Sequence, residues 1–189
     1  MAPDMAWWID GLSIAFLVIW AIGAARTKQT EHRQSNASQV VQRGLAAAGA
    51  ILLFYPRLGV WLDTRLLPGS EDLAYTGLAL TFAGIAFAVW ARFALGRNWS
   101  AVVTIKQDHE LICRGPYALV RHPIYSGMLL GLLGTALDRN NVRAVIGVAS
   151  VALAFWLKMR TEESFMVQQF GDQYRRYRRE VKALIPFLL

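Results

Sequence analysis

Residues 73–91 read LAYTGLALTFAGIAFAVWA, nineteen residues without a charged side chain. A helix needs about 20 mostly apolar residues to cross about 30 Å of hydrocarbon, so this run predicts a membrane-spanning helix. Apolar flanking residues extend four shorter uncharged runs into further spans, at residues 11–25, 44–56, 123–137 and 144–157. We therefore expect an all-α integral membrane bundle of five transmembrane helices.

The composition supports a membrane protein and excludes several soluble classes. Of 189 residues, 55% are hydrophobic and only 17% are charged, whereas a typical soluble domain has roughly 25% charged residues. One cysteine, Cys113, excludes a disulfide framework, and the three scattered histidines exclude a structural zinc cluster. The length predicts one membrane domain over residues 1–189. Asp4 and Asp10, near the first apolar run, argue against a cleavable secretory signal.

Lysines and arginines predict the orientation of the chain. With the N-terminus outside and five crossings, 16 of the 20 basic residues fall on the cytosolic side, as the positive-inside rule requires. The exceptions are Arg57, Arg65, Arg139 and Arg143. The net charge of +7 then faces an anionic leaflet. Because no soluble basic domain is available to bind nucleic acid, we expect membrane lipids as partners and no nucleic acid.

The connecting segments differ in character. Residues 26–43 are polar and linker-like, and residues 138–141 predict a tight turn that makes the last two spans a helical hairpin. Residues 92–121 mix glycine, β-branched and apolar side chains, which indicates a folded functional segment rather than disorder.

The chain after the last span has an amphipathic pattern. Residues 161–181 predict one or two helices that lie on the membrane face, with a break at Gly171. Tyr174 and Tyr177 are expected on the membrane-facing stripe, with the neighbouring arginines in solvent.

Small residues recur at helical spacing on two predicted spans. On the fourth span they are Gly127, Gly131 and Gly134, and on the third they are Gly77, Gly84, Ala88 and Ala91. Lipid gives helices no hydrophobic drive to associate, so close backbone approach holds such a bundle together. The stripes therefore predict close helix packing.

Arg121, His122 and Pro123 form a polar step at the start of the fourth span. Proline at a first helical position presets the turn, and the nearby backbone donors and the helix dipole are suited to receive a carboxylate or another anion. Anchoring at the lipid headgroups explains Arg121 and His122 without any ligand. Position alone leaves both interpretations open.

A second polar cluster ends the last span. Lys158 and Glu162 are i, i+4 neighbours, and Arg160 and Glu163 are i, i+3 neighbours, so two structural ion pairs explain the cluster. However, two adjacent carboxylates at a membrane boundary are costly unless they contact cations or polar ligand groups. The pair therefore also marks a candidate site.

Five motifs follow one another in the second half of the chain. They are GRNWS at 96–100, HELI at 109–112, GPYALVRHPIYSG at 115–127, KMRTEESF at 158–165 and FGDQYRRY at 170–177. Their order and spacing resemble the isoprenylcysteine carboxyl methyltransferase family and its bacterial and archaeal relatives. Phospholipid methyltransferases share the RHP and paired-glutamate elements, so the superfamily is better supported than the branch.

This resemblance implies a membrane enzyme that transfers a methyl group from S-adenosyl-L-methionine without a metal. Cofactor binding then needs no Rossmann domain, in agreement with the absence of a GxGxxG fingerprint from the sequence. Residues 1–91 would hold the first three helices, and residues 92–189 would form a catalytic half with a cofactor-binding segment, the hairpin and a C-terminal amphipathic helix. By motif position, the cofactor contacts would be His109, Glu110, Leu111, Ile112, Tyr117, Arg121, His122, Pro123, Ile124, Tyr125, Glu162 and Glu163.

The resemblance also implies which residues act on the acceptor. The family's substrate-associated arginine falls on Lys158 here, with Arg160 as the alternative cation, so Lys158, Arg160 and Glu162 are the expected catalytic residues. A carboxylate acceptor is ionised at neutral pH and needs no base. An amine acceptor must lose a proton, a role open to Glu162 or Glu163.

The expected reaction is O-methylation of an isoprenylcysteine-like or other lipophilic acid. The acceptor would enter from the bilayer and react at the cytosolic face of the cell membrane. Phospholipid or amine N-methylation is the alternative within the superfamily. A membrane scaffold without enzymatic activity is an alternative from a different class.

Overall fold

The computed structural model describes residues 5–24, 30–33, 36–55, 58–96, 104–106 and 111–188. Two short strands, β1 (Thr30–Arg33) and β2 (Thr104–Lys106), pair antiparallel. The helices within these ranges are α1 (Ala6–Ala24), α2 (Asn36–Phe54), α3 (Glu71–Leu95), α4 (Pro116–Leu119), α5 (Pro123–Arg139), α6 (Val142–Phe170) and α7 (Asp172–Glu180). The architecture is almost entirely helical, as the apolar runs predict.

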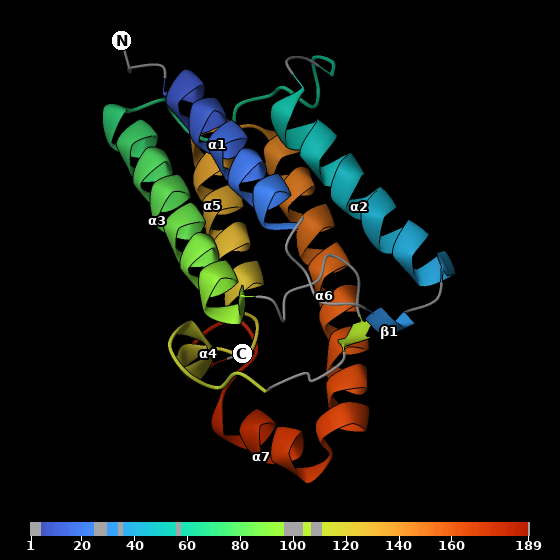
Figure 1. The fold of residues 1–189 in the computed structure, drawn as a ribbon. Coiled ribbons are helices and arrows are strands. Elements are labelled where there is room, and N and C mark those ends of the chain that lie inside the picture. Colours follow the sequence, from blue (N-terminus) through green and yellow to red (C-terminus); the bar gives the residue numbers. More distant parts are fainter. Residues whose placement is uncertain are drawn as a thin grey trace.

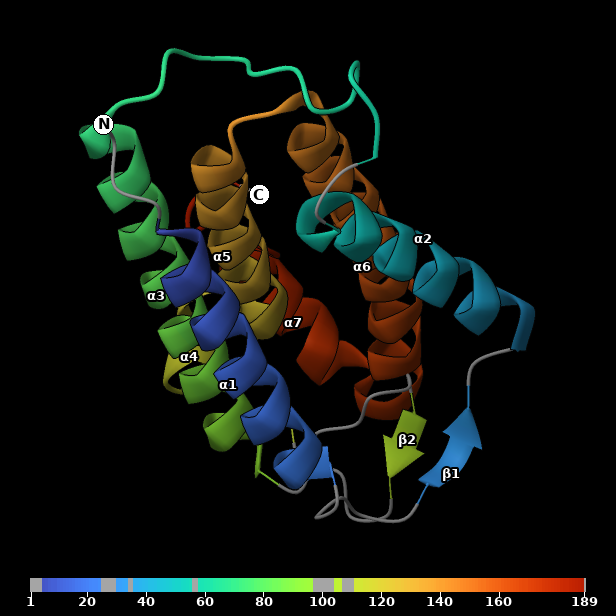
Figure 2. The ribbon, with the colours of Figure 1, turned by 90° about the horizontal axis from the view of Figure 1, so that it is seen from above.

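The long helices α1, α2, α3, α5 and α6 run alternately in opposite directions (Figure 1). α1 lies against α3 and α5, while α2 lies against α6, and α5 contacts α6 between these two groups (Figure 2). The short helices α4 and α7 and the paired strands lie at the end of the bundle where α5 begins and α6 ends (Figure 1). The start of α1 and the turn between α5 and α6 lie at the opposite end.

Among the described residues, three helices are long and apolar enough to cross a membrane, namely α2, α3 and α6. At most 33% of the apolar window of each helix is buried inside the protein, so most of these side chains are left for lipid to cover. α1 supplies a shorter apolar stretch, Ala6–Trp20, and α5 has 17 residues. Membrane crossing by α1 and α5 stays a prediction.

The glycine stripe of α5 packs directly on α3, which confirms the close helix packing predicted from the small residues. A Cβ atom on Gly127 would lie 2.6 Å from both the Gly84 carbonyl oxygen and the Ala88 nitrogen, so only glycine permits this approach. Thr81 of α3 also donates its hydroxyl to the Gly131 carbonyl oxygen of α5 at 3.2 Å. These contacts fix α5 and, with it, the polar step at its N-terminal end.

The helical hairpin turns at Asn140 and Asn141, as the sequence predicts. Asn140 adopts the left-handed conformation, with φ 48°, and the Asn141 side chain caps α6. The buried Arg143 donates to the carbonyl oxygens of Leu52 and Tyr55 at 2.8 and 2.7 Å, which satisfies the end of α2. The hairpin is thereby tied to α2 at the end remote from α7.

Three expectations about the connections are corrected. Residues 26–43 are more than a linker, because they contain β1 and the first turns of α2, and β2 adds a small sheet to the all-α fold. α6 continues to Phe170, so residues 161–170 belong to the same helix as the last predicted span and do not form a separate helix. The charges of Glu162 and Glu163 interrupt the apolar pattern without breaking the helix. Gly171, with φ 51°, does end it as predicted, and α7 follows.

Candidate active site

The site is built around the start of α5. Gly115, with φ 62°, leads the chain into the single turn of α4, and Val120 returns it to an extended conformation. His122 is the N-cap of α5 and Pro123 is its first residue. Proline has no N–H and fits this position without losing a hydrogen bond. The His122 side chain is thereby held at the end of the bundle, where it is buried.

The C-terminal tail covers the backbone of this polar step. The N–H groups of Arg121 and His122 donate to the carbonyl oxygens of Lys182 and Ala183 at 2.8 and 3.0 Å. Both donors are satisfied within the chain, so an anion bound at the start of α5, one of the two interpretations of this step, cannot use them. The anions that approach this step are instead two side-chain carboxylates from α6.

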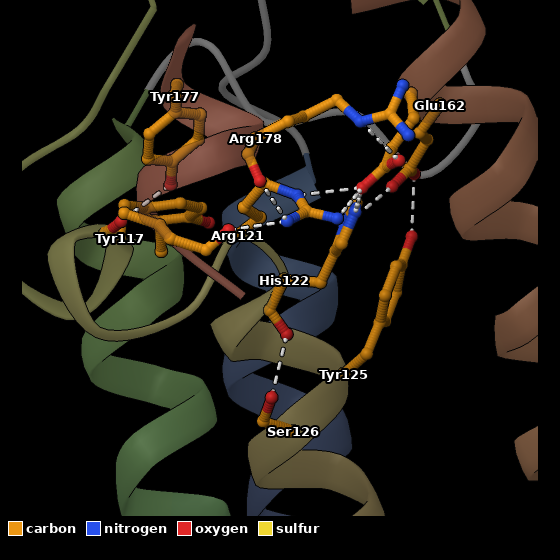
Figure 3. A network of polar contacts seen from close by, with 10 residues as sticks. Tyr117, Arg121, His122, Tyr125, Ser126, Glu162, Tyr177 and Arg178 are labelled. Carbon is orange, nitrogen blue, oxygen red and sulfur yellow. Dashed lines mark hydrogen bonds and ion pairs between the residues drawn. The ribbon is translucent and has the colours of Figure 1, made fainter. Parts of the chain in front are cut away.

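Glu162 and Glu163, adjacent on α6, both contact His122 (Figure 3). The His122 Nδ1 atom lies 3.5 Å from Glu162 Oε2, and its Nε2 atom lies 3.3 Å from Glu163 Oε1. Burial lowers the pKa of His122, but hydrogen bonds and negative charge from the two glutamates outweigh burial and raise it overall. The favoured form is the protonated ring, which donates from both nitrogens and bridges the two carboxylates.

Glu163 is enclosed by cations. Arg121 donates from Nε and Nη2 to Glu163 Oε1 at 2.8 and 2.6 Å, and Arg178 of α7 approaches Oε2 at 3.2 Å (Figure 3). The Arg121 and Glu163 side chains are 10% and 14% exposed, so solvent screens this pair weakly. Both oxygens of Glu163 are committed to bonds that join α5, α6 and α7.

Glu162 has a different environment. The Tyr125 hydroxyl donates to Glu162 Oε1 at 2.6 Å, and His122 contacts the other oxygen. The Glu162 side chain is 24% exposed, compared with 14% for Glu163. Its hydrogen-bond contacts come from a phenol and an imidazole, and Lys158 attracts it electrostatically, whereas Glu163 contacts two arginines. Glu162 is therefore the carboxylate of the pair that keeps capacity for a further cationic group.

Aromatic rings and an apolar cluster adjoin Glu162. The Tyr125 ring stacks on His122, with centroids 5.6 Å apart, and on Phe155 of α6, with centroids 4.7 Å apart. The same cluster contains Ile112, Tyr117, Ile124, Met159 and Leu184. The site thus combines a polar rim with an apolar floor, which suits a ligand that has both characters.

The structure brings together most of the predicted site residues that it describes. The polar group at the ends of α5 and α6 consists of Arg121, His122, Tyr125, Glu162 and Glu163. Ile112, Tyr117 and Ile124 line the apolar cluster, Pro123 starts α5, and Leu111 is partly buried. The predicted contacts His109 and Glu110 lie outside the described residues.

The two candidate cations of α6 face different ways. The Lys158 Nζ atom lies 5.6 Å from the centroid of the Tyr125 ring. Arg160 is exposed, and its guanidinium lies 4.9 Å from the centroid of the Trp156 ring. The expected ion pair of Arg160 with Glu163 is replaced, because Glu163 turns to the arginines of the α5 start and α7. Lys158 is thus the candidate next to the site.

The expectation that Tyr174 and Tyr177 face the membrane is wrong. They are 2% and 7% exposed and lie on the side of α7 that packs against the protein. The Tyr177 hydroxyl donates to the Tyr117 carbonyl oxygen at 2.5 Å (Figure 3), and burial raises the pKa of this phenol, so it remains a donor. The i, i+3 spacing marks one helix face, but it does not tell a lipid-facing side from a protein-facing side.

The long apolar helices are those of an integral membrane protein. At one end of the bundle, carboxylate, imidazole and guanidinium groups form a shielded polar site. A sequence profile of the family described as phospholipid methyltransferase matches residues 73–173, more than half of the chain. The chain belongs to this family. Individual relatives confirm the resemblance to isoprenylcysteine carboxyl methyltransferases.

Relatives from plants and bacteria align with much of the chain. The chain is 33% identical over 119 residues to a probable protein-S-isoprenylcysteine O-methyltransferase of Oryza sativa subsp. indica, covering 61% of this chain and 62% of that protein. It is 31% identical over 145 residues to protein-S-isoprenylcysteine O-methyltransferase A of Arabidopsis thaliana, covering 74% of each. The cobalt-zinc-cadmium resistance protein CzcN of Cupriavidus metallidurans is 33% identical over 159 residues, covering 77% of this chain and 70% of that protein.

A solved structure shares the fold. It is the eukaryotic intramembrane Ras methyltransferase ICMT (isoprenylcysteine carboxyl methyltransferase), with a TM-score of 0.53 and 23% identity. The likeness covers 83% of this chain and 55% of that chain. The chain therefore spans little more than half of the solved protein and less than two thirds of the rice relative.

Proposed function

We propose that this chain is a membrane methyltransferase that uses S-adenosyl-L-methionine to methylate the carboxylate of a lipophilic, isoprenylcysteine-like acid. The observation that carries the proposal is the contact of Glu162 with His122 and Tyr125 where α5 and α6 converge. A shielded carboxylate beside an apolar cluster suits a cationic methyl donor and a lipophilic acceptor in one place. Family membership supports methyl transfer, and the names of the plant relatives support this acceptor class.

The donor set fits S-adenosyl-L-methionine. Glu162 offers an anionic acceptor to the cationic amino group, and the Tyr125 hydroxyl fixes one of its oxygens. We assign both residues, with His122, to holding the cofactor. Ile112, Tyr117 and Ile124 supply the apolar wall. The remaining cofactor contacts that the resemblance implies stay part of this proposal. When bound, the cofactor supplies a methyl group that is already activated by a sulfonium centre.

The neighbours of Glu162 prepare it for this role. The Tyr125 hydroxyl and the protonated His122 ring each favour the ionised carboxylate, and they hold its two oxygens from different sides. A carboxylate fixed before binding loses less conformational freedom when the cofactor arrives. The stacked rings of His122, Tyr125 and Phe155 next to Glu162 would limit the access of water to the cofactor contact.

Lys158 is assigned to the acceptor. A carboxylate acceptor is ionised at neutral pH, so it needs orientation and not a general base. A single ammonium group beside Tyr125 is suited to hold one carboxylate oxygen and leave the other unbonded. Arg160, over Trp156, is on another side of α6 and is not needed for this role.

The proposed orientation places the site on the cytosolic side. The basic residues support an outside N-terminus, which puts the start of α5, α7 and the C-terminal tail in the cytosol. A lipophilic acceptor then enters from the bilayer between helices. The water-soluble cofactor enters from the end that holds α4 and α7.

Phospholipid or amine N-methylation is the second candidate, and the description of the matching family favours it. An amine must lose a proton, so a carboxylate base is required. Glu163 is committed to Arg121 and Arg178, which leaves Glu162 for that role. Glu162 would then serve both cofactor and acceptor, so the carboxyl acceptor needs fewer assumptions.

Methyl-tritiated S-adenosyl-L-methionine tests the proposal on the purified chain in lipid nanodiscs. The acceptors are farnesylcysteine analogues, fatty acids and aminophospholipids. Methyl esters release volatile methanol in alkali, whereas N-methyl products keep the label. We expect alkali-labile label on a farnesylcysteine analogue. Alkali-stable label on an aminophospholipid would favour the second candidate, and a chain without saturable cofactor binding would be a non-enzymatic scaffold.

A further inference from the structure

We propose that residues 181–184, named here the strap, position Arg121 and His122 for cofactor binding. The inference rests on the proposed function, because the strap acts through residues that adjoin the cofactor-binding carboxylate. It assigns a role to a part of the chain that no sequence motif marks. The strap supplies no polar group to the cofactor or the acceptor, and its Leu184 side chain packs against the apolar cluster beside the site.

Backbone bonds join the strap to the step before α5. The Arg121 N–H donates to Lys182 and the His122 N–H donates to Ala183, at 2.8 and 3.0 Å. Pro123 follows directly and has no N–H, so the strap satisfies the two backbone donors next to the helix start. These bonds fix the backbone from which the His122 imidazole projects toward α6.

Side-chain bonds extend the contact in both directions. Arg121 Nη1 donates to the Val181 carbonyl oxygen at 2.5 Å, and the Ser126 hydroxyl donates to the Leu184 carbonyl oxygen at 2.6 Å. Four consecutive carbonyl groups, 181 to 184, therefore each accept a bond from the start of α5. This unbroken series of hydrogen bonds shows that residues 181–184 are packed specifically against the start of α5.

The strap also holds the arginine that encloses Glu163. The Arg121 guanidinium donates to the strap through Nη1 and to Glu163 through Nε and Nη2. α7 delivers the strap from a fixed point, because Tyr177 is bonded to the Tyr117 carbonyl oxygen (Figure 3). Without the strap, Arg121 and His122 would keep their chemistry but lose their fixed directions. The strap residues 181–184 are therefore positioning residues, because they act through Arg121 and His122.

Two shortened chains test the strap. A chain that ends after Glu180 lacks it, and a chain that ends after Ile185 keeps it and serves as the matched control. We expect the first to raise the KM for S-adenosyl-L-methionine about tenfold, the effect of losing one or two net hydrogen bonds. Because the strap touches no reacting group, kcat at saturating cofactor should stay close to that of the control. An unchanged KM, or a loss of kcat at unchanged KM, would overturn the proposal.

Point variants avoid shortening the chain. Ser126→Ala removes one strap bond, Ser126→Thr restores the hydroxyl, and Ser150→Ala removes a similar bond of 2.8 Å from α6 to the Leu45 carbonyl oxygen. We expect about a threefold rise in cofactor KM for Ser126→Ala, rescue by Ser126→Thr, and no rise for Ser150→Ala. An equal rise in Ser126→Ala and Ser150→Ala would indicate general loosening and would contradict the strap.

Hydrogen exchange separates this inference from the proposed function. In the full chain, the Arg121 and His122 amides should exchange slowly, and in the chain ending after Glu180 they should exchange at least tenfold faster. Fast exchange in the full chain would disprove the strap whatever the activity. Slow exchange in a full chain that transfers no methyl group would support the contact and contradict the proposed function alone.

Discussion

Replacing Tyr125 by phenylalanine removes one hydroxyl from the site and little else. This hydroxyl donates to Glu162 at 2.6 Å, and a hydrogen bond to a charged group contributes about 1.5 to 3 kcal/mol. The new ring keeps the stacking on His122 and Phe155. Because His122 still holds the other oxygen of Glu162, we expect the lower end of this range, which is about a tenfold loss of affinity for S-adenosyl-L-methionine.

Equilibrium binding of labelled S-adenosyl-L-methionine in nanodiscs measures this loss. Tyr75→Phe is the matched control, because Tyr75 of α3 is 53% exposed. Its dissociation constant should equal that of the unaltered chain, and both variants should unfold within a few degrees of it. A Tyr125→Phe constant within twofold of the unaltered value would refute the idea that Tyr125 orients Glu162 for the cofactor.

Other perturbations follow from the packing, the two α6 cations and the imidazole. Gly127→Ala should lower the free energy of unfolding by about 1 to 3 kcal/mol, because its Cβ atom would lie 2.6 Å from backbone atoms of α3. The control is Gly44→Ala, whose Cβ atom would meet nothing within 4 Å, and unfolding in detergent compares the two variants. Lys158→Ala should raise the acceptor KM about tenfold and Arg160→Ala should not, as steady-state kinetics will tell. The pKa of His122 is raised in the folded protein. Its contribution to stability is therefore complete below about pH 6.5 and is lost as the pH rises through the folded pKa. The unfolding temperature should fall across this pH range, and it should fall less in the His122→Gln variant.

The fold is largely readable from the sequence because lipid imposes a simple rule. A chain in hydrocarbon must satisfy its backbone internally, so long uncharged runs predict helices. The hairpin turn at Asn140 and Asn141 and the break at Gly171 are also predictable, because asparagine and glycine adopt the left-handed backbone conformation that ends a helix. The end of α6 was not, because Glu162 and Glu163 look like a boundary until their partners in space are known.

The partners of the site residues were less predictable. Local spacing paired Arg160 with Glu163, but the actual partners of Glu163, Arg121 and Arg178, come from other elements. Periodicity reports which residues share a helix face and says nothing of what that face meets. For the same reason, the sequence pattern places Tyr177 against lipid, whereas Tyr177 is buried in the protein. The sequence does not reveal the strap, because its contacts use backbone carbonyl groups, which every residue has.

The adjacent glutamates provide a direct comparison of structural and binding roles. Glu163→Gln leaves Arg121, 10% exposed, without its counter-charge, and breaking such a shielded pair costs about 3 kcal/mol. We expect a lower unfolding temperature with a modest loss of cofactor affinity. Glu162→Gln removes a carboxylate that no arginine encloses in the described part of the chain, so it should unfold near the normal temperature and bind cofactor at least tenfold more weakly. Unfolding and binding measured on both variants decide the assignment, and the opposite pattern would mean that the cofactor contacts Glu163 while Glu162 holds the fold.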